Sequence, residues 1–277
     1  MESSVLDARL AAIETDGFTI LENVFTEERA AALRDRVRGI EQTTLGPLED
    51  GETEEDSSFL RTAGLLRIDP MFWDVPIDPT VTAVVERVLG EDFLLSTFSG
   101  IDLMPNRDTI QPLHPDDALV PVPRPHERAI GCTVMWVLTE FNSGTGGTRL
   151  LPGSHHDPLD LLWSQDQERL SQAIQPDMAP GSVLVFDHAI FHGASDNPSE
   201  EWRLGLQVSY HAGWVRPYTN WFRSIPIEEV REFPERLRDL LGYKTYNGIG
   251  SVNVTPGSYR ESYNGKGRKR DPRLSLV

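Results

Sequence analysis

Residues 181–211 read GSVLVFDHAIFHGASDNPSEEWRLGLQVSYH, and they decide the fold class. Two β-rich runs stand on either side of a polar turn, which is the pattern of paired antiparallel strands. In the second run, four apolar residues alternate with a polar series that begins at Arg203. The alternation predicts one packed face and one polar face. The polar face either meets solvent or lines a polar interior in which Arg203 binds an anion, and periodicity leaves both possibilities open.

Similar short runs precede this pair at residues 93–105, 129–138 and 148–153, separated by Gly, Pro and Asn. Several short strands at such spacing predict an all-β sandwich or barrel. Helical patterns flank this core, at residues 4–16, 26–42, 79–89 and 227–242. Thr26 is the expected N-cap of the second helix, Gly90 ends the third, and Pro234 interrupts the fourth.

The chain is therefore expected to be mainly β with helical flanks, and no linker of the kind that separates domains interrupts it. We expect a single domain over residues 1–277. It would comprise a helical N-terminal flank to about residue 90, a core over about 92–217, and a C-terminal flank and tail over 218–277.

Three residues whose side chains can bind a metal are spaced as a metal site would require. His114 and Asp116 lie two residues apart in QPLHPDDAL (111–119), so their side chains point to the same side of an extended chain. His192 ends a strongly β run 78 residues later. Two histidines and one carboxylate leave several coordination positions free, as non-haem Fe(II) oxygenases require. The motif is weak evidence when taken alone.

The segments QPLHPDD, GGTRLLPGSHH and 180–210, with the opening GFTILENVFTEE, resemble the phytanoyl-CoA dioxygenase family of Fe(II)/2-oxoglutarate oxygenases. The resemblance extends from about residue 15 to about residue 245. It implies a double-stranded β-helix core, also called a jelly-roll or cupin-like core, with the site in its open mouth. It also implies that the polar face led by Arg203 points into the barrel.

The resemblance assigns roles to individual residues. His114, Asp116 and His192 match the triad that holds Fe(II), and Arg203 matches the anchor for the distal carboxylate of 2-oxoglutarate, with O₂ as the second co-substrate. Gln111 and Thr148 match co-substrate contacts of the natural-product branch, and Trp136 aligns with a tryptophan beside the co-substrate. Ala194 departs from the pattern, because the phytanoyl-CoA hydroxylases carry a serine there. This departure argues against a CoA-thioester substrate.

Asp116 bears on the reaction, because related halogenases have Ala or Gly at this position and bind chloride there. The expected reaction is therefore hydroxylation of a small specialised metabolite, with desaturation, epimerisation, cyclisation and endoperoxidation as alternatives. A non-catalytic jelly-roll binding protein, and a Zn²⁺ or Mn²⁺ enzyme with a cupin-like site, are the rival interpretations.

The other candidate residues have less specific patterns. Structural roles are favoured for His155, His156 and Cys132, and His188 is expected to be buried near the metal. His211 shares the polar face of Arg203, and His126 lies in a proline-rich loop interpreted as a rim or lid. Substrate contact is the less favoured interpretation for Arg67, Arg124, Trp221, Phe222 and Arg223.

Composition excludes several classes of function. The net charge of −17 disfavours nucleic acid and anionic membranes as partners, and the basic run at residues 266–273 is interpreted as a solvated tail. The single cysteine and the lack of a signal-like N-terminus indicate a cytoplasmic protein. A small-molecule substrate is expected, and both a monomer and a homodimer remain open.

Overall fold

The computed structural model describes residues 3–44, 59–106, 110–159 and 166–246. The strands are β1 (Phe18–Leu21), β2 (Phe59–Thr62), β3 (Leu94–Leu103), β4 (Gly131–Val137), β5 (Thr148–Leu150), β6 (Val183–Asp187), β7 (His192–Ala194) and β8 (Arg203–His211). The α-helices are α1 (Ser3–Asp16), α2 (Glu27–Thr44), α3 (Leu65–Ile68), α4 (Pro79–Leu89), α6 (Gln167–Leu170), α7 (Trp221–Ser224), α8 (Ile227–Val230) and α9 (Glu235–Arg238). Short 3₁₀ turns cover Pro70–Phe72, Val75–Ile77, Asp116–Leu119 and Ser154–His156, and a π-helical turn covers Asp239–Tyr243.

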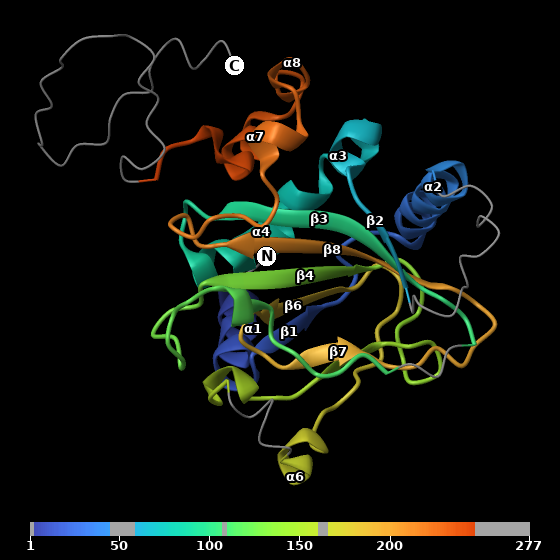
Figure 1. Cartoon of the computed structure of the whole chain (residues 1–277), viewed down its shortest axis with the longest axis vertical. Helices are drawn as coiled ribbons and strands as arrows, with labels where there is room; N and C mark the ends of the chain where they lie inside the picture. The colour runs from blue at the N-terminus through green and yellow to red at the C-terminus, as the bar shows by residue number, and fades with distance from the viewer. Residues whose placement is uncertain (1–2, 45–58, 107–109, 160–165, 247–277) are drawn as a thin grey trace, which may run out of the picture.

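Six strands form one antiparallel sheet in the order β1-β6-β4-β8-β3-β2, and β5 pairs with β7 in a second, two-stranded sheet. Figure 1 shows β7 set apart from the larger sheet. Sequence-distant strands become neighbours here: β8 lies between β3 and β4. The two sheets form the jelly-roll core that the sequence predicted.

The two faces of the large sheet pack against different layers. On one face, β-strand residues such as Val134 and Leu206 pack with Leu33 of α2 and Val85 of α4 in the main hydrophobic core. The other face carries a smaller cluster that includes Met135, Phe186 and Leu150 of β5. The second cluster fills the space between the two sheets, so the barrel interior is apolar at depth.

The predicted helix boundaries are confirmed. The Thr26 side chain accepts a hydrogen bond from the Arg29 backbone N–H at 3.2 Å, as an N-cap does. Helix α4 ends at Leu89, before Gly90 with a φ of 95°. Pro234 separates α8 from α9.

Strand β2 was not predicted. Its four residues are too few for a periodic signal, and pairing with β3 in register stabilises it. The basic run at 266–273 lies outside the described residues. Within the described ranges, every helix is too short or too polar to cross a lipid bilayer.

Gly131, at the start of β4, gives a prediction about stability. A Cβ at this position would overlap the ring of fully buried His188 and approach His211 Cδ2 to 2.8 Å. Overpacking of this kind costs about 1–3 kcal/mol, so Gly131→Ala is expected to lower the melting temperature by several degrees. Thermal unfolding followed by circular dichroism measures the change.

Gly39→Ala is the matched control, because nothing lies within 4 Å of a Cβ there. Alanine replaces glycine inside α2, where it is expected to stabilise by roughly 0.5–1 kcal/mol. Equal melting temperatures for Gly131→Ala and the parent protein would show that the His188 ring can move aside.

Candidate metal centre

The backbone brings the two predicted histidine ligands face to face. His114 and His192 form an isolated antiparallel bridge, with N···O distances of 2.9 and 3.0 Å. Pro115 is extended, with φ −97° and ψ 149°, so Asp116 projects to the same side as His114. One possible ligand atom from each of the three side chains lies within 4.8 Å of the other two. The structure thus brings the predicted triad together.

Backbone carbonyls fix the tautomer of both imidazoles. His114 Nδ1 lies 2.9 Å from the Pro112 carbonyl, and His192 Nδ1 lies 3.1 Å from the Ile190 carbonyl. A carbonyl oxygen can only accept, so each Nδ1 carries the proton and each Nε2 keeps a free lone pair. His192 Nε2 is 3.8 Å from Asp116 Oδ1. Both rings therefore present to the carboxylate the nitrogen that a metal binds.

Hydrogen bonds from three directions hold Asp116. Thr133 of β4 donates to Oδ2 at 2.7 Å, and its hydroxyl lies 2.9 Å from that of Ser209 on β8. Tyr218 donates its phenol to the Asp116 carbonyl at 2.6 Å, and the Asp116 N–H donates to the His188 carbonyl at 2.8 Å. The side chain is fixed through Oδ2, which leaves Oδ1 directed toward His192.

Electrostatics favour the ligand forms of these side chains. Burial lowers the pKa of His192, which keeps it neutral, although Asp116 acts in the opposite direction. Burial alone would raise the pKa of Asp116, but His192, His188, the Thr133 hydrogen bond and His114 together lower it. Metal binding needs neutral imidazole and ionised carboxylate, and the pKa shifts of His192 and Asp116 both act in that direction.

This donor set fits Fe(II). Two imidazole nitrogens and one carboxylate oxygen on converging segments give the two-histidine, one-carboxylate triad with open positions that non-haem iron oxygenases use. The hydrogen bonds from each Nδ1 to a carbonyl are the supporting contacts that metal-bound histidines usually make.

The polar face of β8 lines the barrel interior, which resolves the alternative left open by periodicity. Ser209 reaches Asp116 through Thr133, and Arg203 on the same face is only 2% exposed. Its guanidinium lies over the Phe141 ring at 4.2 Å, and its Nε donates to the Gly146 carbonyl at 3.0 Å. Burial lowers the pKa of Arg203 to about 10, so the side chain stays cationic at neutral pH.

Two of the other three predicted co-substrate contacts lie at the end of the small sheet. Gln111 Oε1 accepts from the Ala194 N–H at 3.0 Å, and Thr148 pairs with Ala194 across β5 and β7. Thr148 follows Gly146, the residue that Arg203 contacts, by two positions. Gln111, Thr148 and Arg203 are thereby gathered around one short stretch of backbone.

Trp136 does not lie where the sequence-based prediction put it. Its side chain packs on the helix-covered face of the large sheet, with its ring centroid 4.8 Å from that of Phe25. Because strand side chains alternate, Thr133 and Met135 face the barrel interior and Trp136 does not. The predicted contact with the co-substrate is therefore wrong.

Four histidines outside the triad are held by contacts or by burial within the protein. His155 and His156 both place Nε2 3.1 Å from the Glu14 carbonyl, in the last turn of α1, where carbonyls lack helical partners. His188 is fully buried, and its pKa falls to about 4 chiefly through that burial. His211 packs edge-on against Tyr218 at 4.7 Å, beside the triad.

Several residues for which substrate contact was the less favoured interpretation make contacts within the protein, as expected. Arg67 pairs with Glu229 at the surface at 2.7 Å, and Trp221 donates from Nε1 to the Leu95 carbonyl at 2.7 Å. Arg124 and His126 are buried against Asp117. Cys132 is buried in the main core, as expected. The other two residues of this group, Phe222 and Arg223, are exposed on the short helix α7.

Arg61 of β2 is a site residue that sequence reasoning missed. Its Nη1 donates to Ser99 at 3.0 Å and to Gln207 at 2.9 Å. Burial lowers the pKa of Arg61, although the charge of Asp116 acts in the opposite direction. Because Gln207 lies on the polar face of β8, Arg61 reaches the edge of the barrel interior. Tyr218 was missed as well. A lone arginine in a four-residue strand, and a tyrosine in a loop, carry no pattern that would identify them.

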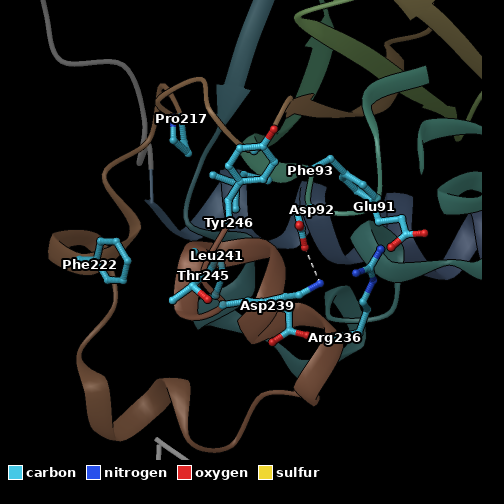
Figure 2. Close-up of a pocket in the computed structure, with 14 residues that line it drawn as sticks. Glu91, Asp92, Phe93, Pro217, Phe222, Arg236, Asp239, Leu241, Thr245 and Tyr246 are labelled. Atoms are coloured by element: carbon cyan, nitrogen blue, oxygen red, sulfur yellow. Dashed lines mark ion pairs between the residues drawn. The ribbon is translucent and has the colours of Figure 1, made fainter. Parts of the chain in front are cut away.

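A separate cavity of about 320 Å³ lies on the C-terminal flank, and Figure 2 shows the residues that line it. It lies between the start of β3 and the turn after α9. Its lining includes Phe93, Phe222, Arg236, Asp239 and Tyr246, and Lys244 Nζ bonds Asp92 Oδ1 at 2.6 Å. None of the triad or predicted co-substrate residues lines it, so it is distinct from the candidate metal centre.

Comparison with known proteins identifies the family and the fold. The family model for phytanoyl-CoA dioxygenase (PhyH) matches residues 13–205. The uncharacterised protein Rv1501 of Mycobacterium tuberculosis is 27% identical over 252 residues, covering 86% of this chain and 87% of its own. The dioxygenase andF of Emericella variicolor is 30% identical over 187 residues, covering 64% of this chain and 62% of its own. HygX from Streptomyces hygroscopicus, solved with nickel and 2-oxoglutarate bound, shares the fold with a TM-score of 0.63 at 17% identity, covering 76% of this chain and 88% of its own.

Proposed function

The chain belongs to the phytanoyl-CoA dioxygenase family and is an Fe(II)/2-oxoglutarate-dependent dioxygenase, and on this premise we propose that His114, Asp116 and His192 hold the iron. The observation that carries the proposal is the pair of imidazoles whose Nδ1 protons are donated to backbone carbonyls. Both Nε2 lone pairs are thereby presented to one carboxylate.

We propose that Arg203 anchors the distal carboxylate of 2-oxoglutarate, with Gln111 and Thr148 as further contacts. A guanidinium can donate two parallel hydrogen bonds to a carboxylate. The Nε of Arg203 donates a hydrogen bond to the Gly146 carbonyl. This bond fixes the plane of the guanidinium and leaves the two Nη groups to bind an anion. The structural relative HygX was solved with nickel and 2-oxoglutarate bound, which supports 2-oxoglutarate as the anion.

When bound, iron and 2-oxoglutarate supply O₂ activation, and the co-substrate leaves as succinate and CO₂. The chain's own residues place the substrate and exclude water. Phe186 lies 4.5 Å from the His192 ring and belongs to the apolar cluster at the base of the site. We propose hydroxylation of an unactivated C–H as the outcome. Desaturation, epimerisation, cyclisation and endoperoxidation share its first step and are the alternatives.

A small specialised metabolite is the proposed substrate. Ala194 stands where the phytanoyl-CoA hydroxylases carry a serine, which disfavours a CoA thioester. Ile110 and Leu119, on either side of the His114 segment, are 49% and 80% exposed, and Tyr218 at the triad is 42% exposed. We propose that these exposed side chains contact the substrate, which favours a substrate with an apolar body.

Succinate formation tests the proposed function. The Fe(II)-loaded protein is incubated with 2-oxoglutarate and O₂, with and without a fractionated metabolite extract of the source organism. A fraction that raises the rate of succinate formation contains the substrate, and mass spectrometry of its product distinguishes hydroxylation from the alternatives. Substrate conversion without O₂ and 2-oxoglutarate would instead identify a hydrolytic or isomerising metal enzyme.

A further inference from the structure

Arg124 is buried against the segment that carries two of the proposed iron ligands. Its Nε and Nη2 donate to the two carboxylate oxygens of Asp117, at 2.8 and 2.5 Å. The side chains of Arg124 and Asp117 are 5% and 2% exposed. Asp117 directly follows Asp116, and both residues donate their backbone N–H to the His188 carbonyl. The paired hydrogen bonds from the Arg124 guanidinium therefore restrain the backbone that carries Asp116.

The same guanidinium also contacts the segment that carries the third ligand. Its Nη2 donates to the Ala189 carbonyl at 2.7 Å, and its central carbon lies 5.3 Å from the centre of the Phe191 ring. Residues 189–191 lead directly into His192. One side chain thus bonds to both ligand-bearing segments, which are also joined by the His114–His192 bridge, the His188 carbonyl and the bonds between Gln111 and Ala194.

His126 completes this cluster. Its Nε2 lies 2.6 Å from Asp117 Oδ2, and its Nδ1 lies 3.1 Å from the Pro123 carbonyl. Arg124 uses its remaining Nη1 on the Asp157 carbonyl at 3.4 Å. Because the described donors of Arg124 all point to protein acceptors, this residue is not available as a substrate contact.

We propose that Arg124 is a positioning residue: by bridging Asp117 and the 189–191 segment, it fixes the distance between Asp116 and His192 and so sets the affinity for iron. The inference rests on the iron site of the proposed function. A lysine cannot replace this fork, because an ammonium group does not span a carboxylate and a carbonyl with planar, divergent donors.

Arg124→Lys and Arg124→Gln test this role through metal binding, without relying on turnover. The metal-free proteins are titrated calorimetrically with Co(II), which substitutes for Fe(II) and resists oxidation. Loss of a contact that supports metal ligands typically costs 10–100-fold in metal affinity. Arg124→Lys is therefore expected to raise the Co(II) dissociation constant by about 10–100-fold. The lysine keeps a cation beside Asp117, so it preserves the fold if Arg124→Gln does not.

Arg169→Lys is the matched control. Arg169 makes contacts of the same kind, to Asp157 at 2.9 Å and to the Pro152 carbonyl at 2.9 Å, but touches neither ligand-bearing segment. Its Co(II) affinity is expected to equal that of the parent protein. Unchanged affinity in folded Arg124→Lys overturns the inference. Equal Co(II) binding by the parent and by His192→Ala would instead reject the iron site on which the inference rests.

Discussion

Replacing His192 with alanine is expected to reduce succinate formation to the background of the metal-free protein. His192 is the iron ligand proposed for the β7 segment. The residue is 7% exposed, and its ring lies against those of Phe186 and His114. Without it, only His114 and Asp116 remain, and two side chains do not retain iron against dilution. Succinate is measured by chromatography, and bound iron is measured in the same samples.

His155→Ala is the control for this variant. His155 is also largely buried, at 9% exposure, but its ring contacts the end of α1. It is expected to lose stability while keeping iron and succinate formation. Full activity and full iron content in His192→Ala would remove His192 from the metal site.

Replacing Arg203 with alanine is expected to raise the 2-oxoglutarate requirement strongly. Truncating one partner of a buried, hydrogen-bonded charge pair costs roughly 2–5 kcal/mol. Since about 1.4 kcal/mol corresponds to a factor of ten, the KM for 2-oxoglutarate should rise by at least about 30-fold. The KM is obtained from the initial rate of succinate formation at increasing 2-oxoglutarate.

Iron binding separates this effect from general damage. Arg203 makes no contact with the triad, so Arg203→Ala should bind Co(II) as the parent does. Arg203→Lys keeps the charge without the planar fork, and it should fall between the parent and the alanine variant. A KM that stays at the parental value in Arg203→Ala would exclude the anchor role.

Local sequence pattern was sufficient to predict the elements and the faces of the strands. The alternation over 203–211 identified a strand with one polar face, and the spacing of His114 and Asp116 placed their side chains together. These features depend on backbone periods of two residues, which the sequence displays directly.

Other features of the site depend on tertiary packing, and the periodicity of the sequence could not predict them. The side chains of β4 point alternately to the two faces of the sheet. Which face of β4 lines the barrel depends on the neighbouring strands, so the sequence alone could not place Trp136. The contact between Arg124 and Ala189 spans 65 positions in the chain. No local sequence pattern predicts such a contact, because it depends on how distant parts of the chain fold together.

If His114, Asp116 and His192 hold the iron and Arg203 anchors 2-oxoglutarate, the co-substrate is expected to chelate that iron. Chelation of Fe(II) by a 2-oxo acid produces a visible charge-transfer band, which an anaerobic titration of the Fe(II)-loaded protein with 2-oxoglutarate detects without any substrate. The band is expected to saturate in the parent protein, to be absent in His192→Ala, and to need far more 2-oxoglutarate in Arg203→Ala. An iron-loaded parent protein that develops no band at any 2-oxoglutarate concentration would contradict the claim.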